Sequence, residues 1–340
     1  MTQQKTKVGL IGAGHVAQVA HIPAYKKNLD VELVAVVDDD PIKAQRIKEQ
    51  FGFAEWYEDI SVMLKKSDVE AVDICTPNYL HAPMAIAALR SGRHVLCEKP
   101  IARNSAEAKR MVATAEKHGR VLMVAMNNRF REDVKVLNQF VKGKELGDIH
   151  FVKAGWLRNA GEWKERRWFT EQNKAGGGAL LDLGSPLLDL AVWSASLRKP
   201  TAVTCSTFGR KGRAGVEDAA CAMVRFAGGA ALMLEVSWNL REPRTNSYLH
   251  IYGSRGGAML NPLQIHKDLQ GVLVNVTPAL EASGHHYFKE SYRHEINHFV
   301  ECVRKKKKPL TSGKDALSTT RIVDAMYESA ASGREVSFDQ

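Results

Sequence analysis

A glycine-rich turn near the start of the chain constrains the fold more than any other feature. The apolar run Lys7–Ile11 leads into this turn, and a helical pattern over His15–Lys27 follows it. The spacing matches G-x-G-x-x-A, in which Gly12 permits a tight turn, Gly14 admits a pyrophosphate, and Ala17 lets the helix pack closely on the strand. The pattern predicts a strand–turn–helix unit that binds a dinucleotide.

The residues around this turn indicate which dinucleotide binds. We expect the helix N-terminus at His15 and Val16 to supply N–H groups to the phosphates. The next apolar run, Val31–Val37, ends at Asp38, close to the place where NAD-binding domains hold an acidic residue for the ribose hydroxyls. The two residues after it are also aspartates, and three carboxylates would repel a 2′-phosphate. The sequence therefore favours NAD over NADP.

Two patterns of apolar residues divide the chain. Residues 1–126 alternate amphipathic helical patterns with continuous apolar runs, which indicates a parallel sheet covered on both faces. From Thr201 to about Val276 strand patterns follow one another with little helix between them, which favours an antiparallel sheet. We therefore predict an α/β protein: an N-terminal Rossmann domain with a doubly wound parallel sheet over residues 1–126, and a C-terminal α/β domain with a large open, mostly antiparallel sheet over residues 127–340.

Bulk composition excludes several classes of protein. Hydrophobic residues make up 44% and charged residues 25%, as in ordinary globular proteins. No apolar run approaches the ~20 residues of a membrane helix, and the polar start Met1–Lys7 has no signal-peptide core, so we expect a cytoplasmic protein without membrane contact. The five cysteines form no CxxC pair, which indicates free thiols and no metal site.

The formal net charge of +10 raises the question of an anionic partner. Part of it lies in the basic run Arg304–Lys308. Because no aromatic residues or reading motif accompany this run, it does not indicate nucleic-acid binding, although an anionic substrate stays open.

Three further motifs follow in order along the chain. Thr76-Pro77-Asn78 and then His81 follow the apolar run Ala71–Cys75, Glu98-Lys99-Pro100 follows the run His94–Cys97, and Gly176-Gly177-Gly178 with Asp182 opens a long helical pattern. With the glycine turn, these motifs resemble those of the glucose–fructose oxidoreductase / inositol dehydrogenase / MocA (Gfo/Idh/MocA) family. The resemblance covers nearly the whole chain. It implies an NAD(P)-dependent enzyme acting on a hydroxyl carbon of a sugar, cyclitol or related compound.

The same resemblance assigns roles to individual residues. Lys99 would be the principal acid/base at the reacting hydroxyl, which is chemically reasonable because a cationic nicotinamide disfavours the protonated form of a neighbouring lysine. Asp182 would orient Lys99 or accept a substrate hydroxyl. The residues that would lie along the nicotinamide end of the cofactor are Thr76, Asn78, His81, Glu98 and Lys99.

One position departs from the family pattern. Four residues after Asp182, where the family usually has a histidine that transfers a proton, this chain has Pro186. Lys99 then acts alone or through Asp182 and water, or another group such as His285, His286, Tyr287 or Tyr292 reaches the site. A third alternative is different chemistry: a glycosidase or dehydratase that oxidises its substrate transiently, or a relative that binds ligand without catalysis.

Aromatic and basic residues indicate the kind of substrate. Asn127 and Arg129 follow the last Rossmann strand and by resemblance line the substrate crevice, although Arg129 could equally form a salt bridge between domains. Trp168 belongs to a loop rich in tryptophan and arginine, which suits stacking on a sugar ring and binding of an acidic group, or packing of the loop itself. With His286 as a further candidate, we expect a sugar-like, possibly anionic substrate. An open sheet with one uncovered face favours a homodimer or homotetramer.

Overall fold

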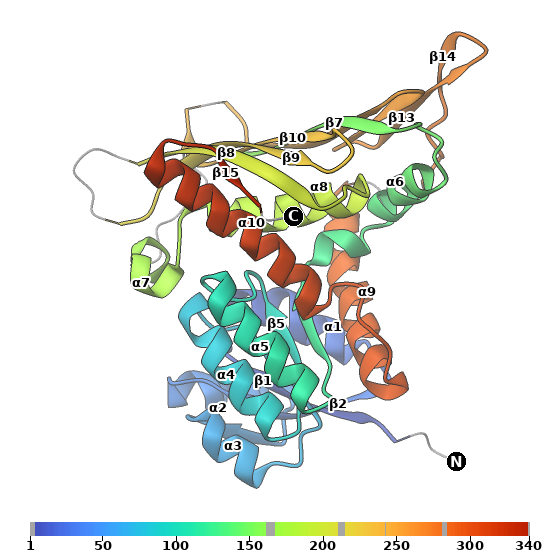
Figure 1. Ribbon diagram of the computed structural model, residues 1–340. Coiled ribbons are helices and arrows are strands. Elements are labelled where there is room, and N and C mark those ends of the chain that lie inside the picture. Colours follow the sequence, from blue (N-terminus) through green and yellow to red (C-terminus); the bar gives the residue numbers. More distant parts are fainter. Residues whose placement is uncertain (1–3, 161–166, 210–214, 242, 281–283, 339–340) are drawn as a thin grey trace. The chain divides into compact units, whose positions relative to one another are not determined.

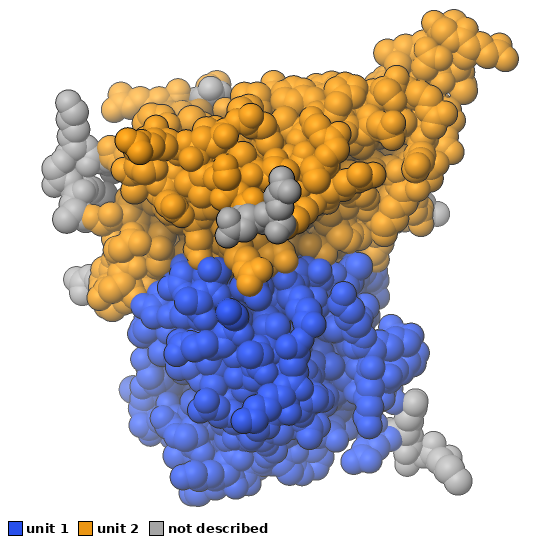
Figure 2. Space-filling model, viewed as in Figure 1, with its two compact units in different colours: residues 1–127, 289–317 blue, residues 128–288, 318–340 orange. Residues whose placement is uncertain are grey.

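The computed structural model describes residues 4–160, 167–209, 215–241, 243–280 and 284–338. These residues group into two compact units, coloured in Figure 2: residues 1–127 with 289–317, and residues 128–288 with 318–340. The segment 289–317 thus belongs with the first unit, whereas a division at residue 126 would leave it in the second. The role of the second unit in substrate binding and oligomerisation stays a prediction.

The first unit is built on a six-stranded parallel sheet. Its order is β3 (Glu55–Tyr57), β2 (Val31–Val37), β1 (Thr6–Ile11), β4 (Ala71–Ile74), β5 (His94–Glu98) and β6 (Leu122–Ala125). The inner strands are buried almost throughout because apolar residues point to both faces, each of which packs against helices. The predicted Rossmann sheet is confirmed. The three-residue edge strand β3 was too short to be predicted.

Helices cover both faces of this sheet, as Figure 1 shows. They are α1 (Ile22–Lys26), α2 (Pro41–Phe51), α3 (Ile60–Lys66), α4 (Asn78–Arg90), α5 (Ser105–Lys117) and, from residue 289 on, α9 (Gly284–Lys305). Side-chain caps fix where three of them begin: the Asp40 carboxylate accepts the N–H of Lys43 at 3.1 Å, Asp59 accepts that of Ser61 at 2.7 Å, and Asn104 accepts that of Glu107 at 3.0 Å. The first predicted helix contains a π-turn at Ala17–His21, which the sequence pattern did not indicate.

The second unit contains a nine-stranded sheet. Its order is β14 (Val272–Asn275), β13 (Gln264–Leu269), β12 (Gly256–Leu260), β11 (Asn246–Gly253), β7 (Ile149–Asn159), β10 (Ala231–Leu240), β9 (Ala219–Phe226), β8 (Pro200–Phe208) and β15 (Val336–Ser337). Only the pair β7–β10 is parallel among the described pairings. The predicted mostly antiparallel sheet is confirmed.

One face of this sheet carries helices. Burial alternates along β9, because every second side chain points into the core. That core also contains α6 (Glu132–Lys142), α8 (Ser185–Ser194) and the part of α10 (Gly313–Ser332) from residue 318 on, and α7 (Gln172–Ala175) is a single turn (Figure 1). On the opposite face, Met223 and Met233 are 39% and 48% exposed. None of the helices in the described ranges is long and apolar enough to span a membrane.

Candidate active site

The glycine turn lies where strand order reverses in the parallel sheet. β1 and β4 are neighbours whose connections leave in opposite directions, and ligands of such sheets bind beyond the strand ends at this point. Gly12 has φ +88°, and a Cβ there would lie 2.9 Å from the backbone carbon and oxygen of Cys75. A Cβ on Gly14 would have Cys75 O at 3.9 Å as its only near neighbour. The turn is therefore closely packed at Gly12 and open at Gly14.

Asp38 lies next to this turn and is 6% exposed. Its Oδ2 accepts the N–H of Ala13 at 2.9 Å, and its Oδ1 lies 2.7 Å from Nζ of Lys43. The Asp40 carboxylate is directed to the start of α2, where it caps the helix. Sequence analysis missed Lys43, a cation within reach of the position where a 2′-phosphate would sit.

These features fit a dinucleotide. Gly14 leaves room beside the backbone for phosphates, and Asp38 stands at the end of the adjacent strand for a ribose. Just after β4, the hydroxyl oxygen of Thr76 is buried and has no hydrogen-bond partner in the described part of the chain. A buried hydroxyl without a partner is costly, so this atom is suited to meet a ligand. Gly14, Asp38 and Thr76 are the residues that would hold the cofactor.

His81 connects two of the sequence motifs. It is 1% exposed, with Nδ1 2.8 Å from the carbonyl oxygen of Pro100 and Nε2 2.8 Å from that of Thr76. Burial lowers the pKa of His81, and a neutral ring donates one N–H. His81 therefore lies between the turn after β4 and the turn after β5, and its single N–H donates to one of the two carbonyl oxygens at a time. Its direct contact with the cofactor stays a prediction.

Lys99 follows β5, at the same edge of the sheet as the glycine turn. The Glu98 Oε2 accepts the backbone N–H of Lys99 at 2.9 Å, so the buried carboxylate fixes the start of the turn that carries the lysine. Asn78, the first residue of α4, is also buried at the edge where β4 ends. The two motifs predicted to lie together at this edge, Thr76-Pro77-Asn78 and Glu98-Lys99-Pro100, do so.

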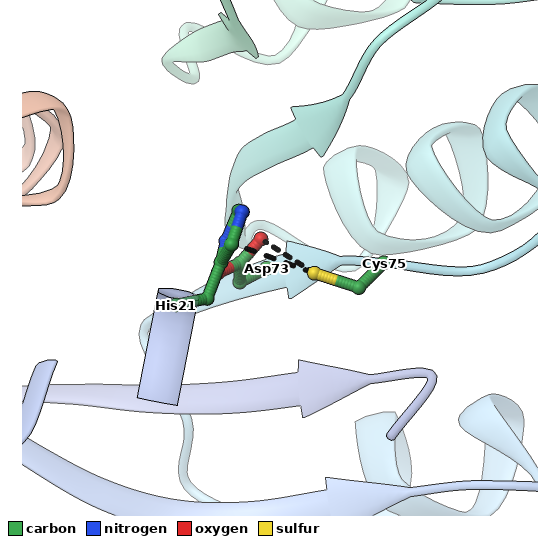
Figure 3. Close-up of side chains that lie close together, drawn as sticks. All are labelled: His21, Asp73 and Cys75. Carbon is green, nitrogen blue, oxygen red and sulfur yellow. Dashed lines mark hydrogen bonds and ion pairs between the residues drawn. The ribbon is translucent and has the colours of Figure 1, made fainter. Parts of the chain in front are cut away.

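A buried polar cluster lies below this edge, and Figure 3 shows three of its members. His21 ends the π-turn and is completely buried, with Nδ1 2.7 Å from Oδ2 of Asp73 and Nε2 3.0 Å from Oε1 of Glu98. The Cys75 thiol lies 3.7 Å from Nδ1 of His21. From α9, Tyr292 places its ring 5.6 Å from that of His21. The only signal in the sequence was Asp73, an acidic residue within an apolar run.

In the second unit, Asp182 lies in a π-turn, Leu180–Gly184, and is 9% exposed. Its Oδ2 accepts the indole N–H of Trp238 at 2.9 Å and lies 3.9 Å from Nη1 of Arg158. Phe169 packs edge-on against Trp238 and is stacked on Trp168 with ring centroids 3.9 Å apart. The predicted Asp182 and Trp168 are therefore connected through two aromatic rings.

The three glycines before Asp182 have a packing role. Glu217 accepts N–H groups of Gly178 at 3.0 Å and Leu180 at 2.9 Å, as well as the hydroxyl of Tyr327 at 2.9 Å. A Cβ on Gly178 would overlap the backbone oxygen of Glu217. Burial raises the pKa of Glu217 above its usual range. Sequence analysis missed Glu217 because its partners are distant in the sequence.

Pro186 lies in the first turn of α8, directly after the π-turn. Proline lacks an N–H, and in an α-helix its ring collides with the carbonyl four residues earlier, here that of Asp182. Because the chain is locally wound as a π-helix at Asp182, the proline stands at the start of a new α-helical segment, where it is tolerated. The departure from the family pattern thus coincides with a change of helix type at Asp182.

The remaining predicted residues have partners of their own. The Arg129 guanidinium is 6% exposed and forms a bidentate pair with Asp189, at 2.7 and 2.5 Å, within the second unit. This salt bridge joins two residues of the same unit, and is not the one between domains that the sequence left open. The Asn127 amide donates to Ser291 Oγ at 3.0 Å. His286 falls in the first turn of α9, and its side chain lies outside the described residues.

Comparison with known proteins identifies the class. Residues 6–126 match the model of the GFO/IDH/MocA oxidoreductase family, described as an NAD-binding Rossmann fold, and residues 134–259 match that of the family's C-terminal domain. The chain is 32% identical over 354 residues to D-glucoside 3-dehydrogenase of Escherichia coli strain K12, covering 99% of this chain and 98% of that protein. The chain therefore belongs to the Gfo/Idh/MocA oxidoreductases and has an NAD-binding Rossmann domain, which confirms the predicted family, cofactor and enzyme class.

Levoglucosan dehydrogenase is a second relative, known from sequence and structure. The protein of Pseudarthrobacter phenanthrenivorans is 29% identical over 290 residues, which cover 76% of this chain and 74% of that one. A solved structure of levoglucosan dehydrogenase in complex with NADH and levoglucosan matches with a TM-score of 0.89 at 26% identity, covering 99% of this chain and 100% of that chain.

Proposed function

We propose that this oxidoreductase transfers a hydride between nicotinamide and a hydroxyl carbon of a sugar, sugar acid, cyclitol or nucleotide sugar, with Lys99 as the principal acid/base. The observation that carries the proposal is the position of Lys99 after β5, where Glu98 accepts its backbone N–H at 2.9 Å. The relatives support the substrate class, because a glucoside dehydrogenase and a levoglucosan dehydrogenase are among them.

A residue of the chain has to accept the proton that the substrate hydroxyl releases. Oxidation of a secondary alcohol to a ketone releases one hydride and one proton, and the bound dinucleotide supplies the hydride acceptor. The amine of Lys99, when neutral, accepts the hydroxyl proton, and it returns that proton in the reverse reaction. No histidine is needed at position 186 if Lys99 performs both steps.

The second unit contributes substrate binding in this proposal. The Asp182 carboxylate, which the indole N–H of Trp238 orients, would accept a substrate hydroxyl. The half-buried rings of Trp168 and Phe169, which pack on the buried Trp238, would provide aromatic faces for a sugar ring. Arg158, 29% exposed beside Asp182, is suited to an acidic group on the substrate. We further infer a homo-oligomer, dimer or tetramer, because side chains such as Met233 are exposed on the uncovered sheet face.

A substrate panel tests the proposal. Purified protein is incubated with NAD and with sugars, sugar acids, cyclitols and nucleotide sugars, while the absorbance of reduced nicotinamide and the product mass are followed. We expect formation of a keto product with equal formation of NADH. Product formation without net NADH would instead show transient oxidation, and ligand binding without turnover would show a non-catalytic relative.

The Lys99→Ala variant tests the role of the lysine. We expect kcat to fall by about 10²–10⁴-fold, the usual contribution of a positioned acid/base, while NAD affinity changes less than about threefold. Lys109→Ala, at an exposed position of α5, is the matched control and should behave as the unaltered enzyme. If Lys99→Ala retains full turnover, another group performs the proton transfer.

A further inference from the structure

The buried cluster around His21 connects two strands of the parallel sheet to the turn that carries Lys99. His21 is 0% exposed and bridges Asp73 of β4 to Glu98 of β5, at 2.7 and 3.0 Å. The other oxygen of Glu98 accepts the backbone N–H of Lys99. A continuous row of hydrogen bonds thus runs from Asp73 through the imidazole and Glu98 to the residue proposed as the acid/base.

Electrostatics favours a charged imidazole in this row. Burial alone would lower the pKa of His21, but the carboxylate of Asp73 raises it well above its usual range. Burial likewise would raise the pKa of Glu98, yet its hydrogen bond and ion pair with His21 lower it. A protonated ring has an N–H on each side, so it can donate to both carboxylates at once.

The groups that surround the row are neutral. Burial raises the pKa of the Cys75 thiol to about 12, and it raises that of Tyr292 above its usual range. Glu295 of α9 is completely buried, neither of its oxygens has a hydrogen-bond partner in the described part of the chain, and burial raises its pKa well above its usual range. The protonated Glu295 therefore adds no third negative charge beside Asp73 and Glu98.

Two other uses of this cluster are less consistent with the geometry. Because His21 is fully buried and has a carboxylate at each nitrogen, it is not available to substrate. His21, Asp73 and Cys75 have ligand atoms within 4.8 Å of one another, as a metal site would require. However, a metal needs the thiolate, and the ring nitrogen already lies at hydrogen-bond distance from Asp73.

We propose that His21 and Asp73 are positioning residues for Lys99: together they hold the Glu98 carboxylate in the orientation that fixes the turn carrying the lysine. This inference rests on the proposed function of Lys99. It assigns the buried cluster to the reaction although none of its members need touch the substrate. A displacement of about 1 Å in a catalytic group can lower the rate about 100-fold, so a positioning role is measurable in kcat.

Four variants test this role. Asp73→Asn keeps the side-chain volume and removes the charge, His21→Leu removes both donors, and His21→Gln retains one donor for Glu98. We expect kcat to fall about 10- to 100-fold for Asp73→Asn and His21→Leu, with partial recovery in His21→Gln. The KM for substrate and the affinity for NAD should change less than about threefold. Cys75→Ser is the matched control and should retain full kcat, because the Cys75 side chain contacts His21 and Asp73 but does not link them to Glu98.

Other outcomes are equally informative. In the double variant His21→Leu/Asp73→Asn, the loss should be no larger than in His21→Leu alone, because both changes break one row. If folded Asp73→Asn and His21→Leu proteins, checked by NAD affinity, retain full kcat while Lys99→Ala is inactive, the positioning role is wrong and the proposed function stands. If Cys75→Ser loses as much kcat as Asp73→Asn and added Zn²⁺ raises the activity of the unaltered protein, the cluster is a metal site and the inference is overturned.

Discussion

In each of the two units, within the described residues, a π-turn carries a buried polar residue, but the partners of that residue differ. His21 in the first unit lies between two carboxylates from the adjacent strands β4 and β5. Asp182 in the second unit is held by a tryptophan N–H from β10 and lies near an arginine of β7. The first arrangement gathers acidic groups below a strand edge, whereas the second surrounds one acidic group with donors.

The difference separates two tasks. The acidic groups of the first unit lie next to the turn that carries Lys99, where they can hold the proposed acid/base in place. The donors of the second unit leave Asp182 oriented, with aromatic rings beside it that suit a sugar. The changes proposed below should therefore affect cofactor binding or substrate handling, but not both.

A matched pair of glycine substitutions gives the largest expected effects. Gly12→Ala places a Cβ 2.9 Å from the Cys75 backbone at φ +88°, so NAD affinity should fall at least about 100-fold. Gly178→Ala overlaps the Glu217 backbone and should lower the unfolding free energy by about 3 kcal/mol, with NAD affinity retained in the folded protein. Calorimetric titration and thermal unfolding measure both. Gly209→Ala, whose new Cβ would have no atom of the described residues within 4 Å, is the control. A loss of NAD affinity in folded Gly178→Ala would contradict the separation of cofactor binding from substrate handling.

A substitution at Trp238 has an intermediate effect. Trp238→Phe removes the N–H that Asp182 accepts at 2.9 Å, and a buried acceptor left without its donor costs about 1–3 kcal/mol. We expect kcat/KM to fall about tenfold with unchanged NAD affinity, measured by steady-state kinetics. Trp193→Phe, which keeps an aromatic ring beside Arg129, should change neither quantity. An equal loss in both variants would show that Asp182 needs no donor from Trp238.

The smallest effect concerns the choice between NAD and NADP. Asp38→Asn removes the charge that pairs with Lys43 at 2.7 Å, so the lysine becomes available to a 2′-phosphate. The affinity ratio of NADP to NAD should rise about fivefold, because lysine binds phosphate as a point charge. Adding Lys43→Ala should cancel the gain. If NADP already binds the unaltered protein more tightly than NAD, the interpretation of Asp38 is wrong.

The residues that the sequence offers for the cofactor follow strand ends, and their contact with the cofactor stays a prediction. An apolar run followed by glycine or polar residues marks both the end of a parallel strand and the edge where ligands bind, which indicated Gly12 and Asp38. Thr76 and Lys99 were assigned by the resemblance of their motifs to those of the family. Both sheets could also be predicted from the pattern of apolar residues. This pattern differs between strands that are buried on both faces and strands that are buried on one face.

The remaining site residues had no local signal. His21 meets Asp73 and Glu98 across long stretches of chain, and a π-turn does not alter the apolar pattern that predicts a helix. Trp238 and Glu217 are recognisable only by partners on other elements, and Glu295 only by its complete burial. Arg129 was predicted at the substrate, but its partner, Asp189, lies 60 residues later in α8 and could not be selected from spacing alone.

A single-turnover measurement with Lys99→Ala tests the central claim most directly. Protein saturated with NAD is mixed with the substrate found in the panel, and the absorbance of reduced nicotinamide is followed in the first turnover. The account predicts that the variant binds NAD as the unaltered enzyme does but forms NADH at least about 100-fold more slowly. Formation of NADH at the unaltered rate would contradict the assignment of Lys99 as the acid/base.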